Sequence, residues 1–140
     1  MTVTTADIYK AVYTLLRNGS VATIWSGENM PEGEVEQERV VVHVKDISYG
    51  RTWSKCFVEV NVVVPDLKKS MANLVRLETL EREYSTLLSQ GTGVVEGVRY
   101  RLKRDRVSVI ASSQLKAHYV NCRLLFEFLN TLEQWQQYQQ

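Results

Sequence analysis

The sequence lacks the features that would place it in a membrane or direct it out of the cell. No apolar run approaches the roughly 18–20 residues that a membrane-spanning helix needs. The N-terminal stretch MTVTTADIYK has neither the basic start nor the apolar run of a signal peptide. Cys56 and Cys122 are the only cysteines, and each lies on the apolar side of an expected strand, so we expect reduced core residues. These absences predict a cytosolic protein with no membrane association.

An excess of charge of either sign is missing as well. Seventeen Lys and Arg stand against sixteen Asp and Glu, which leaves a formal net charge of +1. Such a chain has no overall positive field that would attract nucleic acid. Its 140 residues suffice for one core, and its apolar fraction of 44% and charged fraction of 24% are those of globular domains. We predict a single domain over residues 1–130, followed by a polar C-terminal extension over residues 131–140.

Sequence motifs of enzymes and of metal sites are also missing. The chain contains no glycine-rich phosphate loop, HExxH, CxxC or GxSxG. A zinc site made from His43, His118, Cys56 and Cys122 would need all four on one surface, which strand alternation opposes. The glutamates between residues 32 and 38 could form a carboxylate pair, but a catalytic pair needs a pocket that raises one pKa. We therefore expect no enzyme, no metal and no cofactor.

What the sequence does have is a strongly alternating segment over residues 53–64. Every second position forms an apolar face: Ser54, Cys56, Val58, Val60, Val62 and Val64. This period of two is typical of a strand with one face on a core. Pro65 cannot donate to a strand ladder and is expected to end the strand, and Asp66 is expected to cap a helix over residues 67–88.

The remaining segments predict a fold of two hairpins and two helices. Residues 39–47 and 53–64 form the first expected hairpin, and residues 99–110 and 118–129 form the second. A first helix begins after Thr4 or Thr5 and ends at Asn18-Gly19, as if with a left-handed cap. Residues 21–25 and 94–98 suggest further short strands. We predict an α+β domain, with an antiparallel sheet of about four strands and two helices packed on it.

Two segments of opposite charge are the strongest functional signal. Residues 26–38 are acidic and without periodicity, so they form either a loop that becomes ordered on assembly or a solvated connector. Residues 99–106 are strongly basic and could contact nucleic-acid phosphates, with Tyr100 stacking nearby, or form a solvated strand face. Opposite charges on two segments also suit head-to-tail contacts between subunits, which can close into rings.

The order of these segments resembles the tail-terminator and tail-completion proteins of long-tailed bacteriophages. After a short N-terminal helix, the matching segments are IWSGENMPEGEVEQE, RVVVHV, SKCFVEVNVVV, NLVRLETLEREYSTLL and HYVNCRLLFEF. The resemblance extends over roughly residues 5–129 and depends on the order of elements.

The resemblance implies a structural virion protein that is not an enzyme. Such a protein forms a homo-oligomeric ring, typically a hexamer, which caps the tail tube, ends its polymerisation and joins the tail to the head. Its partners would be copies of itself, the tail tube protein and a neck or head-completion protein, with DNA only as cargo. It would assemble in the bacterial host cytoplasm and remain in the tail or neck of the virion. The alternatives are another head–tail connector of a phage or prophage, or a small nucleic-acid-binding module.

Eight residues are predicted to make the subunit or partner contacts of such a ring. The acidic loop offers three carboxylates, the basic strand three cations, and the C-terminal extension two aromatic rings, which concentrate interface energy. These residues are Glu32, Glu34, Glu36, Arg101, Lys103, Arg104, Trp135 and Tyr138.

Overall fold

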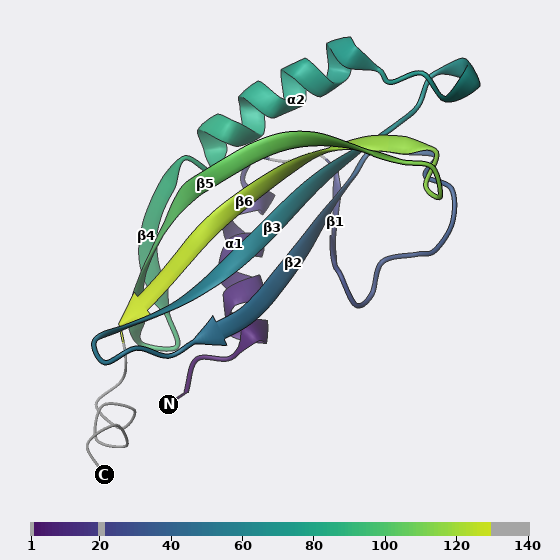
Figure 1. Ribbon diagram of the computed structural model, residues 1–140. Coiled ribbons are helices and arrows are strands. Elements are labelled where there is room, and N and C mark those ends of the chain that lie inside the picture. The colour runs from purple at the N-terminus through teal and green to yellow at the C-terminus, as the bar shows by residue number, and fades with distance from the viewer. Residues whose placement is uncertain (1, 20–21, 130–140) are drawn as a thin grey trace.

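The computed structural model describes residues 2–19 and 22–129 and shows a strongly curled sheet of six strands with two helices on one face (Figure 1). The elements are α1 (Thr5–Arg17), β1 (Thr23–Ser26), β2 (Arg39–Ser48), β3 (Trp53–Pro65), the 3-10 helix η1 (Lys68–Ser70), α2 (Leu74–Leu87), β4 (Gln90–Val95), β5 (Val98–Ser112) and β6 (Ala117–Leu129). In this part of the chain, neither α-helix is long and apolar enough to cross a membrane.

The strand order is β1-β2-β3-β6-β5-β4. Both predicted hairpins are confirmed, since β2 pairs antiparallel with β3 and β5 pairs antiparallel with β6. The predicted count of about four strands is wrong, because β1 and β4 extend the sheet at its two edges. A purely antiparallel sheet is also wrong, because β1 pairs parallel with β2. A parallel pair needs a long return connection, and the acidic segment between Ser26 and Arg39 provides it.

The main core lies between the helices and one face of the sheet. All six alternating residues of β3 are buried there: Ser54, Cys56, Val58, Val60, Val62 and Val64. From β6, Phe126 and Phe128 enter the same core and are completely buried. We call this face of the sheet the helix face and the opposite one the outer face. The sequence prediction that β3 and β6 each bury one face is confirmed.

Helix α1 begins and ends where the sequence predicts, but it lacks the predicted left-handed cap. Thr4 and Asp7 form a reciprocal capping box, in which Thr4 Oγ1 accepts from Asp7 N at 3.2 Å and Thr4 N donates to Asp7 Oδ2 at 2.9 Å. Ile8, Val12 and Leu16 are buried against the sheet, as their spacing predicts. Gly19 follows the C-cap residue Asn18 and is not among the described glycines with positive φ, so the predicted left-handed cap is wrong.

Helix α2 starts one to two turns later than the sequence predicts. Pro65 ends β3 as expected, but Asn73 caps the helix, with its Oδ1 accepting from Arg76 N at 3.3 Å. The predicted capping role of Asp66 is wrong, because its carboxylate lies 2.6 Å from Nδ1 of His118 and belongs to the end of the sheet. Residues 67–73 therefore extend beyond β3 before the helix begins, with η1 among them.

Candidate functional site: an assembly surface at one end of the sheet

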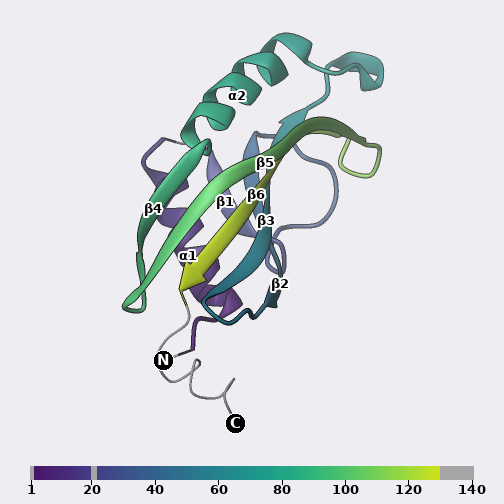
Figure 2. The ribbon, with the colours of Figure 1, turned by 60° about the vertical axis from the view of Figure 1, so that its left-hand side comes forward.

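The candidate site lies at the end of the sheet where β3 ends and β6 begins. We define this distal end as β1, residues 67–75 and the second half of β5, residues 105–112. The opposite end, which holds β4 and the first half of β5, is called the proximal end. Figures 1 and 2 both show the start of α2 and the far half of β5 at the same end of the molecule.

Exposed apolar side chains are concentrated at the distal end. Nine large apolar side chains are exposed in the described part of the chain, and six of them lie there: Leu67, Met71, Leu74, Val75, Val109 and Ile110. Leu74 and Val75 expose 71% and 79% of their surface. We call residues 67–75 the apolar strip. Gathered apolar exposure of this kind marks interaction sites on soluble proteins, whereas scattered single residues do not.

The sequence places three residues of this strip in the core, and the structure corrects that interpretation. Leu67, Met71 and Leu74 share the helical period of the buried residues further along α2, and are expected to face the sheet. Because α2 begins only at Leu74, residues 67–73 leave that register and lie outside the core. The buried side chains of α2 that pack against the sheet are those of Leu77, Leu80 and Tyr84.

The distal half of β5 also has an unpaired edge. The register between β4 and β5 ends at the pair Gln90 and Lys103, followed by a bond from Arg104 N to Ser89 O at 3.1 Å. Beyond that point, no strand among the described residues pairs with β5 on its outer side. The segment from Val107 to Ala111 contains neither charge nor proline. An edge without these protective residues is a template for another strand.

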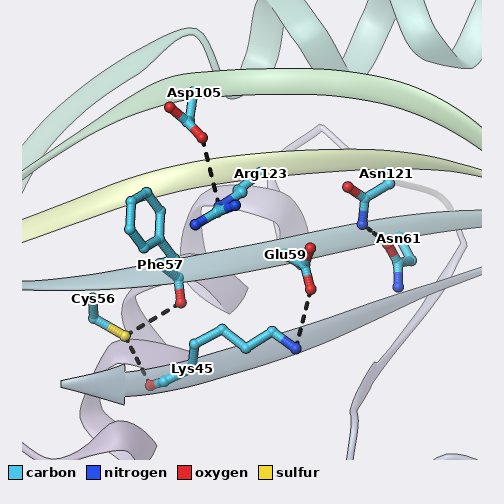
Figure 3. A network of polar contacts seen from close by, with 8 residues as sticks. All are labelled: Lys45, Cys56, Phe57, Glu59, Asn61, Asp105, Asn121 and Arg123. Atoms are coloured by element: carbon cyan, nitrogen blue, oxygen red, sulfur yellow. Dashed lines mark hydrogen bonds and ion pairs between the residues drawn. The ribbon is translucent and has the colours of Figure 1, made fainter.

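The outer face carries a network of polar contacts (Figure 3). Lys45 Nζ lies 3.1 Å from Glu59 Oε2, and Asn121 Nδ2 donates to Asn61 Oδ1 at 2.6 Å. Burial raises the pKa of Glu59, but the hydrogen bond and charge of Lys45 outweigh it, so this pKa is lowered overall. Burial and the charge of Lys45 also lower the pKa of His43 on the same face. These groups are paired with one another across strands, which is typical of a structural surface.

A second part of this network surrounds Arg123. Its Nε lies 3.5 Å from Asp105 Oδ2, and its guanidinium carbon lies 3.9 Å from the centre of the Phe57 ring (Figure 3). A guanidinium over an aromatic face is attracted by the ring and is also held in orientation. The carboxylate comes from the bulge of β5, between Arg104 and Arg106. This contact therefore lies where the unpaired half of β5 begins.

The described histidines and cysteines do not converge on a metal site. His43 lies on the outer face, His118 pairs with Asp66, and both cysteines are buried in the core. Burial raises the pKa of Cys56 and of Cys122 to about 11, so both remain protonated thiols at neutral pH. Within residues 2–19 and 22–129, no group of three or more potential ligands gathers around one point.

The acidic loop is held by contacts within its own chain. Glu38 accepts two hydrogen bonds from Arg76, at 2.7 and 2.9 Å, which ties the end of the loop to the first turn of α2. Glu34 Oε2 lies 3.5 Å from Lys116 Nζ, and Val35 is buried in a small cluster on the outer face. The loop that the sequence suggests would order on assembly therefore already packs in one chain. Of the predicted contact residues, Glu32, Glu34 and Glu36 are all exposed.

Arg39, at the start of β2, is a residue that sequence reasoning missed. Its side chain is only 8% exposed, and Nη1 donates to Pro31 O at 3.4 Å. Its Nε and Nη2 have no partner among the described residues. A buried guanidinium with unused donors is energetically costly. The alternation of β2 places Arg39 on the polar face, but gives no sign that the acidic loop would cover it.

The predicted basic cluster is divided between two faces of the sheet. Arg101 lies on the outer face, 3.2 Å from Glu127 and with its guanidinium carbon 4.0 Å from the centre of the Trp53 ring. Lys103, two residues further on, shares that face and is exposed. Arg104 instead donates to Ser85 O of α2 at 3.0 Å, on the helix face. Arg101 and Lys103 therefore share the outer face, and Arg104 lies apart from them on the helix face.

The acidic loop and the basic residues also lie in different halves of the sheet. The loop packs beside the turn before β6, whereas Arg101 and Lys103 pair with the last residues of β6. They do not meet within one chain, which leaves the predicted contact between neighbouring copies geometrically open. The two aromatic residues nominated in the C-terminal extension, Trp135 and Tyr138, lie outside the described residues.

Comparison with known proteins gives a fold and no function. No protein-family model matches the sequence, and no curated protein sequence matches it. A solved structure whose name indicates no function matches with a TM-score of 0.56, over 93% of this chain and 98% of its own. The sequence identity is 12%, so the likeness shows the fold alone.

Proposed function

We propose that the chain is a structural protein of a long-tailed bacteriophage that forms a ring at the end of the tail tube. The ring ends tube polymerisation and gives the tail a surface to which the neck of the head can bind. The function is one of binding between subunits. No step of catalysis is involved, and no cofactor takes part.

The observation that supports the proposal best is the incomplete covering of the distal end. Six exposed apolar side chains and an unpaired strand edge lie together there. Burying a Leu or Val side chain is worth about 1.5–3 kcal/mol, so this surface holds much unused binding energy. A monomer gains nothing from it, whereas a protein that assembles does. The resemblance to tail terminators in element order supports a ring at the end of a tail tube as the kind of assembly.

A ring also requires that the two contacting surfaces of a subunit differ. Head-to-tail contacts close into a ring when the rotation between copies allows it, whereas identical patches give only pairs. The distal end offers two unlike edges, the short strand β1 and the half of β5 that β4 leaves uncovered. The chain thus offers unlike surfaces, as a ring subunit must.

The proposal is tested by assembling the protein with the tail tube protein of the same phage. Light scattering after size-exclusion chromatography should give one discrete oligomer, and adding it to growing tubes should stop elongation at one end. A protein that remains a monomer at every concentration and salt, with or without tube protein, would overturn the proposal. Binding to a neck protein without any effect on tubes would instead identify a head–tail connector.

A further inference from the structure

The free edge of β1 and the unpaired edge of β5 lie at the same position along the strand direction, and this points to the contact between copies. We infer that the unpaired edge of β5 in one copy pairs with the outer edge of β1 in the next, so that one sheet continues around the ring. The inference rests on the proposed ring and names the surface that builds it. The occupant of the β5 edge is therefore a second copy of this chain.

The level of the two edges follows from the printed register of the strands. One row runs straight across the sheet through five paired residues: Ile24, Val40, Val62, Val120 and Val109. The next row runs through Thr23, Arg39, Val63, Tyr119 and Ile110. The short strand β1 therefore lies opposite the half of β5 that β4 leaves uncovered. Among the described residues, no strand pairs with the other side of β1 either.

Strand direction and pleat also suit this pairing. Strand β1 runs parallel to β2, and three antiparallel pairs then separate β2 from β5, so β1 and β5 run in opposite directions. An antiparallel ladder forms when the next copy is placed level with the first. Ile24 then lies across from Val109 on the helix face, and Thr23 across from Ile110 on the outer face. No like charges oppose each other in these pairs.

The apolar strip completes the contact. A ladder of four residues is too small for a stable interface, which usually buries more than about 1,000 Å². Helix α2 packs over β6 and β5, and its first turn, which contains the exposed Leu74 and Val75, lies at the same end of the sheet as the uncovered half of β5 (Figures 1 and 2). Their burial would add apolar area on the helix face beside the new strand pair.

Copies joined by a head-to-tail contact form a ring when the rotation between them closes, and a helical filament when it does not. Here the pairing of β1 with β5 needs no shift, because both strands lie in the same rows. The curl of the sheet supplies the rotation from one copy to the next (Figure 1).

Cysteine cross-linking between two different variants tests this contact. Thr23→Cys and Ile110→Cys are made separately, since both side chains are exposed and either variant should fold. Facing residues of an antiparallel pair have Cα atoms about 4.5–5.5 Å apart, which suits a disulfide. The native cysteines do not interfere, because they are buried and their pKa values are raised to about 11. The matched control is Val94→Cys, at an exposed position of the edge strand β4.

After oxidation with oxidised glutathione, the mixture of Thr23→Cys and Ile110→Cys should give a disulfide-linked dimer at least about 10-fold more abundant than in either variant alone. The mixture of Thr23→Cys and Val94→Cys should give none above that background. If light scattering shows assembly but the Thr23–Ile110 link is absent, or Val94 is linked instead, the inferred contact is overturned and the ring proposal stands. If the wild-type protein never assembles, the ring and the contact fall together.

Discussion

The two ends of the sheet contain the same central strands and differ in how those strands are covered. At the proximal end, β4 pairs with β5, and the Tyr100 ring stacks on Phe126 at 4.7 Å between ring centres. Gly93 of β4 makes room for that ring, because a Cβ there would lie 2.6 Å from the Tyr100 hydroxyl. At the distal end, the β5 edge has no partner strand among the described residues, and apolar side chains are exposed. The edge of β5 is therefore covered at the proximal end, whereas the distal end leaves binding surface unused.

The largest expected effect comes from truncating a buried side chain at the proximal end. Phe126→Ala removes a completely buried ring that contacts both Tyr100 and Phe128. Such truncations cost about 3–5 kcal/mol in the free energy of unfolding. Leu74→Ala, at the distal end, should change the free energy of unfolding by less than about 0.5 kcal/mol. Urea unfolding measures both, and equal losses would contradict the division between the two ends.

The second prediction concerns the open end and its assembly. Leu74→Glu combined with Val75→Glu places two charges on the apolar strip, where both side chains are more than two-thirds exposed. If assembly buries these side chains at about 1.5–3 kcal/mol each, the variant should weaken self-association or tube binding by at least about 100-fold. Its unfolding free energy should remain close to that of the wild type.

The matched control for that variant is Val94→Glu, which places a charge on an exposed apolar position at the proximal end. Light scattering across a range of concentrations should show wild-type assembly for this control. If Val94→Glu weakens assembly as much as the double variant does, the assembly surface is not confined to the distal end.

A smaller effect is expected where the acidic loop is tied to α2. Glu38→Gln removes the charge from a pair of hydrogen bonds to Arg76, whose pKa the contact raises. Because about a third of each side chain is exposed, the loss should be only about 0.5–1 kcal/mol, and smaller still at high salt. Glu36→Gln, at an exposed position of the same loop, should have no measurable effect. Thermal unfolding at two salt concentrations measures both.

The smallest expected effect is a pH dependence from the outer face. Burial, then the charge of Lys45, lowers the pKa of His43 in the folded state below the ordinary value of 6.5. The unfolded chain therefore binds this proton more tightly, and stability should decrease as the pH falls below about 6.5. His43→Gln should reduce that decrease between pH 7 and 5. Glu59 acts only further down, because its lowered pKa gives stability that is lost below its ordinary value of 4.5.

Those parts of the fold that depend on local alternation could be predicted from the sequence. The six buried positions of β3 and the capping box at Thr4 follow from spacing and residue type within a few residues. The apolar run over residues 21–25 also predicts the edge strand β1, but the pairing of the edge strands could not be predicted. The pairing of β1 with β2 is parallel and depends on a long connection that brings the chain back beside β1. Strand β4, Gln90–Val95, contains glycines that suggest a loop, and the packing of Tyr100 against Gly93 explains why a strand forms there.

The candidate site was predictable only in its charges. The exposure of Glu32 and Glu36 follows from their charge and their position in a loop. The apolar strip, in contrast, has the same helical period as a helix that packs on a core, although its residues are exposed. Its exposure depends on where α2 begins, and the residue that caps this helix is Asn73 and not Asp66. Asp66 does not cap the helix, because its Oδ1 lies 2.6 Å from Nδ1 of His118, a residue far away in sequence.

Amide hydrogen exchange, compared between dilute monomer and concentrated assembly, tests the central claim most directly. The account predicts new protection in Val107–Ser112 of β5, in Thr23–Ser26 and in the apolar strip, because these segments gain partners only on assembly. It predicts no change in Gln90–Val95 of β4. Protection that appears in β4 while the distal half of β5 exchanges as in the monomer would contradict the account.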